Sequence, residues 1–143
     1  QSFQLAQQAG LQFSFTPTHL EGAHPNTARI QLTGASGNQI SVQGASVGGG
    51  NILITQINGM AVSFTGQYNT LLVLHHDQPG VIAAVTNFIA SSDLNIGNFR
   101  LSRPRKGGEA VMTIEVDGDV PDSLMESLRG QPHVLNVVLI RAI

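Results

Sequence analysis

The chain has 143 residues, of which 41% are hydrophobic and only 11% are charged, and its formal net charge is −2. This balance excludes an intrinsically disordered chain and provides no basic excess for binding nucleic acid or an anionic membrane surface. Because the sequence contains no cysteine, the chain itself forms no disulfide, thiolate zinc site, cysteine nucleophile or cysteine-ligated iron–sulfur cluster.

The sequence shows neither a membrane-spanning run nor a targeting signal. No apolar stretch approaches the roughly 18 residues of a membrane-spanning helix. The polar, glutamine-rich start does not have the pattern of a signal peptide. We therefore expect a cytoplasmic protein. Because the first residue is Gln1 rather than methionine, we also expect a fragment of a longer chain.

The first half of the chain predicts a mainly antiparallel sheet. Residues 1–10 favour a helix that ends at Gly10. Leu11, Phe13 and Phe15 then alternate with polar residues, which is the pattern of a half-buried strand. After a loop over 16–26, the same alternation and two hairpin turns predict strands at 28–32, 39–47, 51–57 and 60–65, with turns at 34–38 and Asn58-Gly59.

A short polar break at 66–69 separates this half from a different pattern. We assign residues 1–66 to one module and residues 69–143 to another. The second module predicts, in chain order, elements at 69–76 (strand), 79–92 (helix), 94–103 (strand), 110–116 (strand), 121–129 (helix) and 134–140 (strand). This βαββαβ order is ferredoxin-like, with two helices on one face of a four-stranded sheet. The predicted fold class is α+β.

The segment from His75 to Gly80 lies where the first strand of the second module turns into its helix. The N–H groups that begin a helix are unpaired and carry partial positive charge, so they can hold a carboxylate. Gly80 lets a ligand approach the backbone, and the His and Asp side chains supply a donor and an acceptor. The alternative is that Asp77 only caps the helix and that the histidines only end the strand.

The element order, the His-x-Asp-x-Pro-Gly turn at 75–80 and the Leu94-Asn95-Ile96 segment resemble an ACT domain. That family commonly binds amino acids at the interface between paired domains. The resemblance implies that His75, Asp77 and Asn95 hold a serine-like ligand, although the family often has Asn at the position of Asp77. It also implies that backbone N–H groups near Gly80 and Val81 hold the carboxylate of the ligand.

The first half resembles the β chain of bacterial iron–sulfur L-serine dehydratase, in which an allosteric-substrate-binding-like domain precedes an ACT domain. The resemblance is carried by residues 21–27, Thr33-Gly34 and 44–52, and an upstream Ser-Ser-Ser-His-Thr stretch of the family is missing. It implies a β subunit of an L-serine ammonia-lyase that forms pyruvate and ammonia. The [4Fe-4S] cluster is then expected on the partner α subunit, and this chain alone is not expected to be catalytic or to bind a cofactor.

Two loops of the first half are candidates for contact with that partner. His24 and Asn26 offer an imidazole and an amide on a proline-containing turn that could reach the active site of the α subunit. The alternative is a histidine that only stabilises its loop. Gly48, Gly49, Gly50 and Asn51 could expose backbone N–H groups to an anion, or they could simply form a wide turn that another backbone approaches closely.

Other functional classes have little support. Adjacent side chains in a strand point to opposite faces, so His75, His76 and Asp77 do not predict a metal site. The basic cluster of Arg100, Arg103, Arg105 and Lys106 lies near one aromatic residue only, so we interpret it as a solvated hairpin tip. No nucleophile elbow is present.

We therefore expect a regulatory, interface-forming subunit that binds L-serine or another amino acid and pairs with a second copy through its ACT module. A rival hypothesis is a stand-alone regulatory domain similar to the C-terminal part of phosphoglycerate dehydrogenase. The His24-Pro25-Asn26 and Gly48–Asn51 segments favour the dehydratase. A third hypothesis is a dimerisation module without a ligand, which would hold if side chains of the chain itself filled the turn at 75–80.

Overall fold

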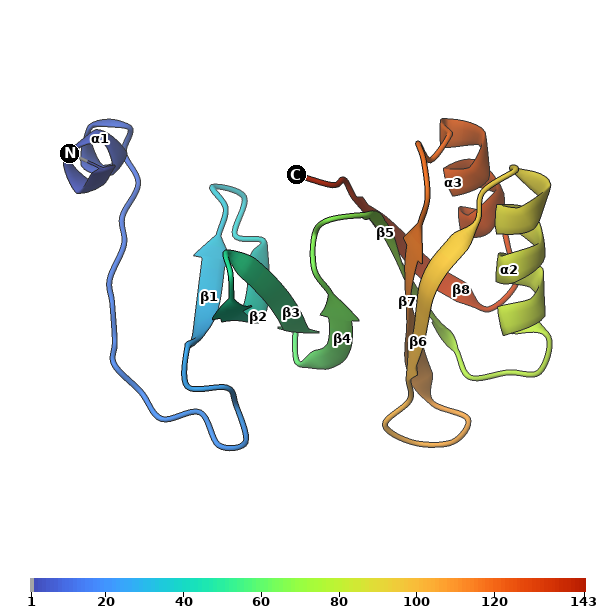
Figure 1. Ribbon diagram of the computed structural model, residues 1–143, viewed down its shortest axis with the longest axis horizontal. Coiled ribbons are helices and arrows are strands. Elements are labelled where there is room, and N and C mark those ends of the chain that lie inside the picture. The colour runs from blue at the N-terminus through green and yellow to red at the C-terminus, as the bar shows by residue number, and fades with distance from the viewer. Residues whose placement is uncertain (1) are drawn as a thin grey trace.

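The structure is a computed structural model that describes residues 2–143. Two four-stranded antiparallel sheets follow one another along the chain, and two helices cover one face of the second sheet (Figure 1). The predicted α+β fold class is therefore confirmed. In the described part of the chain, no helix is long and apolar enough to cross a membrane.

The chain begins with the helix α1 (Ser2–Gln8), which is followed by Gly10 in the left-handed conformation with a φ of 79°. Gln1 lies outside the described residues. The strand predicted at 11–15 is not formed. The rings of Phe13 and Phe15 instead pack against Phe3, at centroid distances of 5.3 and 5.7 Å. This local aromatic cluster takes the place of the sheet contacts that the alternating pattern predicted.

The first sheet is a meander of four strands in the order β1-β2-β3-β4. Its strands are β1 (Thr27–Thr33), β2 (Gln39–Gly48), β3 (Asn51–Ile57) and β4 (Met60–Phe64). Asn58 and Gly59 have φ values of 49° and 79°, so both central residues of the β3–β4 hairpin are left-handed. The Asn-Gly pair is the sequence that this turn requires.

The second sheet has the order β6-β7-β5-β8. It is built from β5 (Asn69–His76), α2 (Val81–Ser91), β6 (Ile96–Ser102), β7 (Glu109–Val116), α3 (Asp122–Arg129) and β8 (Val134–Ile140). The βαββαβ order of the prediction is therefore confirmed. β5 is central, and because β7 is antiparallel to both β5 and β6, these two strands run in the same direction. α3 packs against β8, which leaves α2 over the half of the sheet that contains β6 and β7.

Each face of the second sheet has a separate apolar core. The larger core lies between the sheet and the helices, and its fully buried members include Leu71, Val85, Ile89, Ile114 and Leu128. The smaller core joins the two sheets through Val62, Phe64, Leu72 and Val111. Successive side chains of a strand point to opposite faces, so Leu71 of β5 enters the larger core and the next residue, Leu72, enters the smaller core.

A buried carboxylate also joins the two modules. Glu115 of β7 is 6% exposed. Its Oε1 accepts hydrogen bonds from the backbone N–H of Thr65 at 3.3 Å and from the Thr65 hydroxyl at 3.5 Å, and its Oε2 accepts one from Asn98 at 2.9 Å. Since Thr65 follows β4 directly, these bonds attach the connection between the modules to the second sheet.

Candidate functional site

The turn between β5 and α2 leaves the start of α2 open. Gly80 is the N-cap, with a φ of 89°, and no side chain caps the helix. A Cβ added at Gly80 would meet nothing within 4 Å. The hypothesis that Asp77 only caps this helix is therefore wrong. The N–H of Val81 donates to the carbonyl of Gln78 at 3.4 Å, which is the long limit of a hydrogen bond, and N–H groups of the first helical turn have no partner within the helix. The turn at Gly80 and Val81 can therefore accept a carboxylate from outside.

Asp77 is bound to a hairpin that is distant in sequence. Its Oδ2 accepts a hydrogen bond from the N–H of Gly107 at 2.9 Å and lies 3.5 Å from Nη1 of Arg103. Its backbone N–H also donates to the carbonyl of Gly108, at 2.8 Å. Asp77 therefore connects the turn at 75–80 to the β6–β7 hairpin, and its side chain is only 16% exposed.

His75 lies on the helix-covered face of β5 and is 1% exposed, whereas His76 is exposed on the opposite face. Nδ1 of His75 lies 2.8 Å from the carbonyl oxygen of His76. A carbonyl accepts hydrogen bonds only, so this contact assigns the proton to Nδ1 and leaves Nε2 as an acceptor. Nε2 is buried and has no hydrogen-bond partner among residues 2–143. An acceptor left in that state is costly, and a donor on a bound ligand would satisfy it.

Asn95 does not lie with these residues. It directly precedes β6, and its amide donates to Oδ2 of Asp117 at 2.8 Å. The neighbouring Ile96 pairs with Val116, at the end of the sheet where β5 begins, whereas His76 pairs with Glu109 at the other end. A strand rises about 3.4 Å per residue, so the length of β5 separates Asn95 from Asp77 within one chain.

The two loops of the first module, by contrast, share one end of the first sheet. The N–H of Ser46 donates to the carbonyl of Asn26 at 3.0 Å, which places the His24 loop beside the end of β2. The exposed His24 accepts a hydrogen bond at Nδ1 from the N–H of Asn26, at 3.2 Å. The imidazole therefore stabilises its own loop, as the alternative hypothesis predicted.

The glycine turn between β2 and β3 has three left-handed residues in succession. Gly48, Gly49 and Gly50 have φ values of 97°, 63° and 80°. No other residue type adopts such a run without strain, which explains the sequence. Asn51 accepts a hydrogen bond from the Gln67 amide at 3.0 Å, so this turn also contacts the connection between the modules. Binding of an anion here stays a prediction.

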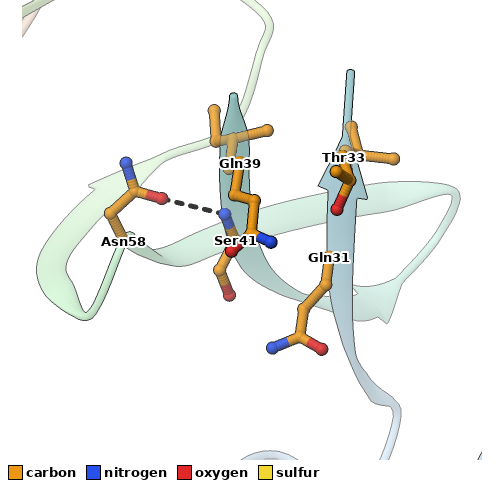
Figure 2. Close-up of a pocket in the computed structure, with 7 residues that line it drawn as sticks. Gln31, Thr33, Gln39, Ser41 and Asn58 are labelled. Carbon is orange, nitrogen blue, oxygen red and sulfur yellow. Dashed lines mark hydrogen bonds between the residues drawn. The ribbon is translucent and has the colours of Figure 1, made fainter. Parts of the chain in front are cut away.

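Figure 2 shows a polar hollow that the sequence did not predict. It lies at the opposite end of the first sheet from His24, where Gln31 pairs with Ser41 and Thr33 pairs with Gln39 across β1 and β2. The backbone N–H of Ser41 donates to Oδ1 of Asn58 at 2.8 Å along its wall (Figure 2). The alternation of polar residues on these strands was its only sequence signal. None of the predicted site residues lines it.

Two groups of exposed charged residues lie at opposite ends of the second sheet. Arg103, Arg105 and Lys106 are exposed at the hairpin tip, as the interpretation of a solvated tip requires. Asp93, Asp117 and Asp119 are exposed at the end that carries Asn95. Among residues 2–143, no group of three His, Asp or Glu side chains is placed to hold a metal ion.

Comparison with known proteins agrees with both resemblances. The ACT domain family matches residues 69–133. The chain is 34% identical over 139 residues to the probable L-serine dehydratase β chain of Bacillus subtilis, covering 97% of this chain and 63% of that protein. It is 36% identical over 130 residues to the L-serine dehydratase β chain of Peptoniphilus asaccharolyticus, covering 90% of this chain and 59% of that protein.

A third relative is the D-3-phosphoglycerate dehydrogenase of Bacillus subtilis. It is 27% identical over 136 residues, which cover 95% of this chain but only 26% of that protein. The chain spans about 63% and 59% of the two dehydratase β chains that it matches. The second module therefore matches the ACT domain family over residues 69–133, and over most of its length the chain is similar to the β chains of L-serine dehydratase.

Proposed function

We propose that this chain is part of the β subunit of a two-subunit L-serine ammonia-lyase, where it forms the subunit interface and carries a regulatory amino-acid site. The observation that carries the proposal is the 34% identity to a dehydratase β chain over 97% of this chain. The phosphoglycerate dehydrogenase relative supports the rival regulatory domain less strongly, at 27% identity.

The cluster chemistry of such an enzyme does not fit the residues of this chain. An iron–sulfur cluster needs thiolate ligands, and the sequence contains no cysteine. We therefore assign the [4Fe-4S] cluster to the α subunit, and this chain supplies no cysteine ligand to it. What the chain offers to its partner is the exposed end of the first sheet, with His24, Asn26 and the turn from Gly48 to Asn51.

The amino-acid site is proposed to form between two copies of the ACT domain. In one chain, Asp77 and Asn95 lie at opposite ends of the sheet. If two β6 strands pair antiparallel about a two-fold axis, the Asn95 end of each copy meets the Asp77 end of its partner. The ligand carboxylate would then bind the open start of α2 at Gly80 and Val81, and its polar groups would bind His75, Asp77 and the partner copy's Asn95.

The surface next to β6 suits this pairing. β6 is an edge strand, and α2, which covers that half of the sheet, has no charged residue between Val81 and Ser91. Ile82 of α2 is a large apolar side chain exposed to solvent. On the other half, α3 presents Asp122, Glu126 and Arg129 to solvent. An uncharged helix beside an open strand edge is typical of an interface, and a charged helix is typical of a solvated surface.

The charges at the two ends of the sheet also favour an antiparallel pair. Asp93, Asp117 and Asp119 at the Asn95 end would approach Arg103, Arg105 and Lys106 at the Asp77 end of the partner copy. A parallel pair would bring like charges together at both ends. Complementary charges of this kind mainly set orientation and association rate.

Activity assays test the proposal as a whole. The purified chain, mixed with the α subunit of a dehydratase and its reconstituted cluster, should form pyruvate from L-serine, and neither component alone should do so. Calorimetry with a panel of amino acids should show binding to this chain in the absence of the α subunit. Amino-acid binding without any activity in the mixture would favour the stand-alone regulatory domain instead.

A further inference from the structure

Half of one apolar sheet face is uncovered in this structure. Ala28, Ile30, Leu32 and Ile40 lie on the same face of β1 and β2, because Ile30 pairs with Val42 and Leu32 with Ile40. Towards β3 and β4 this face continues into the core against the second sheet. On β1, however, Ile30 and Leu32 are each 53% exposed. An apolar face that is covered at one side and open at the other is a candidate interface.

The N-terminal arm, residues 2–16, is a second uncovered apolar surface. Phe3 and Phe13 are stacked and Phe15 packs edge-to-face against both, yet Phe15 is 77% exposed and Phe3 59% exposed. From Ser2 to Leu20 the chain contains no Asp, Glu, Lys or Arg. Figure 1 shows the arm at one side of the molecule, separate from the sheet that contains β1.

The polar and apolar residues of the arm match those of β1. Residues 28, 30 and 32 of β1 are apolar, and residues 29, 31 and 33 are polar. In the arm, residues 11, 13 and 15 are apolar, and residues 12, 14 and 16 are polar. β1 is an edge strand, so its outer N–H and C=O groups can pair with another strand. An antiparallel strand with Phe13 opposite Ile30 would place every apolar residue on the uncovered face and every polar residue on the other.

We propose that residues 11–16 of a second copy of this chain add to β1 as a fifth strand. The second copy is the occupant because each arm lies clear of its own sheet in the structure (Figure 1). When two copies exchange arms about a two-fold axis, the β1 edge of each copy gains a strand partner. The interface uses neither the β6 edge nor the amino-acid site, so it goes beyond the proposed function.

Engineered disulfides test this strand exchange, and the absence of native cysteine makes the readout clean. In the proposed register Gln12 lies opposite Gln31, and directly opposed residues of an antiparallel pair are at the distance that a disulfide requires. The chain carrying Gln12→Cys is mixed with the chain carrying Gln31→Cys, oxidised, and separated on a non-reducing denaturing gel. We expect a covalent heterodimer. The mismatched control pairs Gln12→Cys with Thr33→Cys and should react at least about tenfold more slowly.

Three further variants test the interpretation. Adding Ile30→Ser to the Gln31→Cys chain should slow cross-linking about tenfold or more, whereas Ser41→Ala, on the polar face of the sheet, should not change it.

In the double variant Gln12→Cys/Gln31→Cys, the expected product is a covalent dimer. A monomer with an internal disulfide would overturn the proposal in favour of arm closure within one chain. Equal rates for the matched and mismatched pairs, or no cross-link at all, would also overturn it. Calorimetric amino-acid binding should be unchanged in these variants, so a failure here would not affect the proposed function.

Discussion

Asp77 stabilises the β6–β7 hairpin and is proposed to bind a ligand as well, and its replacement by alanine should test both roles. The substitution removes the acceptor for the Gly107 N–H at 2.9 Å and the ion pair with Arg103 at 3.5 Å. A hydrogen bond to a charged group contributes about 1.5–3 kcal/mol when it is shielded from water. The ion pair contributes less than about 1 kcal/mol because the Arg103 side chain is 46% exposed. With partial solvent screening, we expect a loss of about 1–2 kcal/mol in the free energy of unfolding.

That loss corresponds to a decrease in Tm of about 3–6 °C for a chain of this size. Asp77→Asn is the matched control, because its amide oxygen can still accept from Gly107 while the charge is lost. It should lower the Tm by less than about 2 °C. The backbone bond between Asp77 and Gly108 remains in both variants and keeps the hairpin attached.

Calorimetry on the same variants reports the second role. If Asp77 also contacts the amine or hydroxyl of a bound amino acid, Asp77→Ala should weaken L-serine binding by about ten- to a hundredfold. Scanning calorimetry without ligand and titration calorimetry with L-serine separate the two effects. A Tm of Asp77→Ala equal to that of the unmodified chain would refute the structural role. Unchanged affinity would remove Asp77 from the site.

Three further predictions concern a buried carboxylate, a core leucine and the surface charges. Glu115→Ala leaves the Asn98 amide and the Thr65 donors without their acceptor, so it should cost about 2–3 kcal/mol in urea unfolding, whereas Glu115→Gln should cost less than half of that. Leu71→Ala empties a fully buried position and should cost about 2–5 kcal/mol, whereas Leu135→Ala on the exposed edge of β8 should cost less than about 0.5 kcal/mol. If opposite charges face one another across the ACT pair, sedimentation should show weaker self-association in high salt, and a salt-independent Kd would contradict that arrangement.

The local pattern was sufficient to predict the elements of the ACT domain. The apolar run at 69–76 and the helical spacing of Val81, Val85 and Ile89 each depend on residues close in sequence, and the structure forms the strand and the helix there. The Asn58-Gly59 turn was also predictable, because few other residue pairs adopt two left-handed conformations in succession.

Contacts between distant segments were not predictable in the same way. The partner of Asp77 is the N–H of Gly107, 30 residues further along the chain, and nothing in the turn itself indicates that hairpin. The alternation at 11–15 predicted a half-buried strand, and this prediction was wrong, because in the structure these residues pair with no other strand and stay exposed. The family resemblance implied that Asp77 and Asn95 hold one ligand, and the register of the sheet puts the two residues at opposite ends within one chain.

The central claim is that one amino-acid site is shared between two copies of the ACT domain, and a mixing experiment tests it most directly. Asp77→Ala and Asn95→Ala, each alone, should bind L-serine weakly. When the two variants are mixed and allowed to exchange, half of the dimers are mixed, and each of these contains one site with both native residues. Calorimetry should then recover about one quarter of the sites at native affinity. No recovery in a mixture whose exchange has been verified would contradict the shared site.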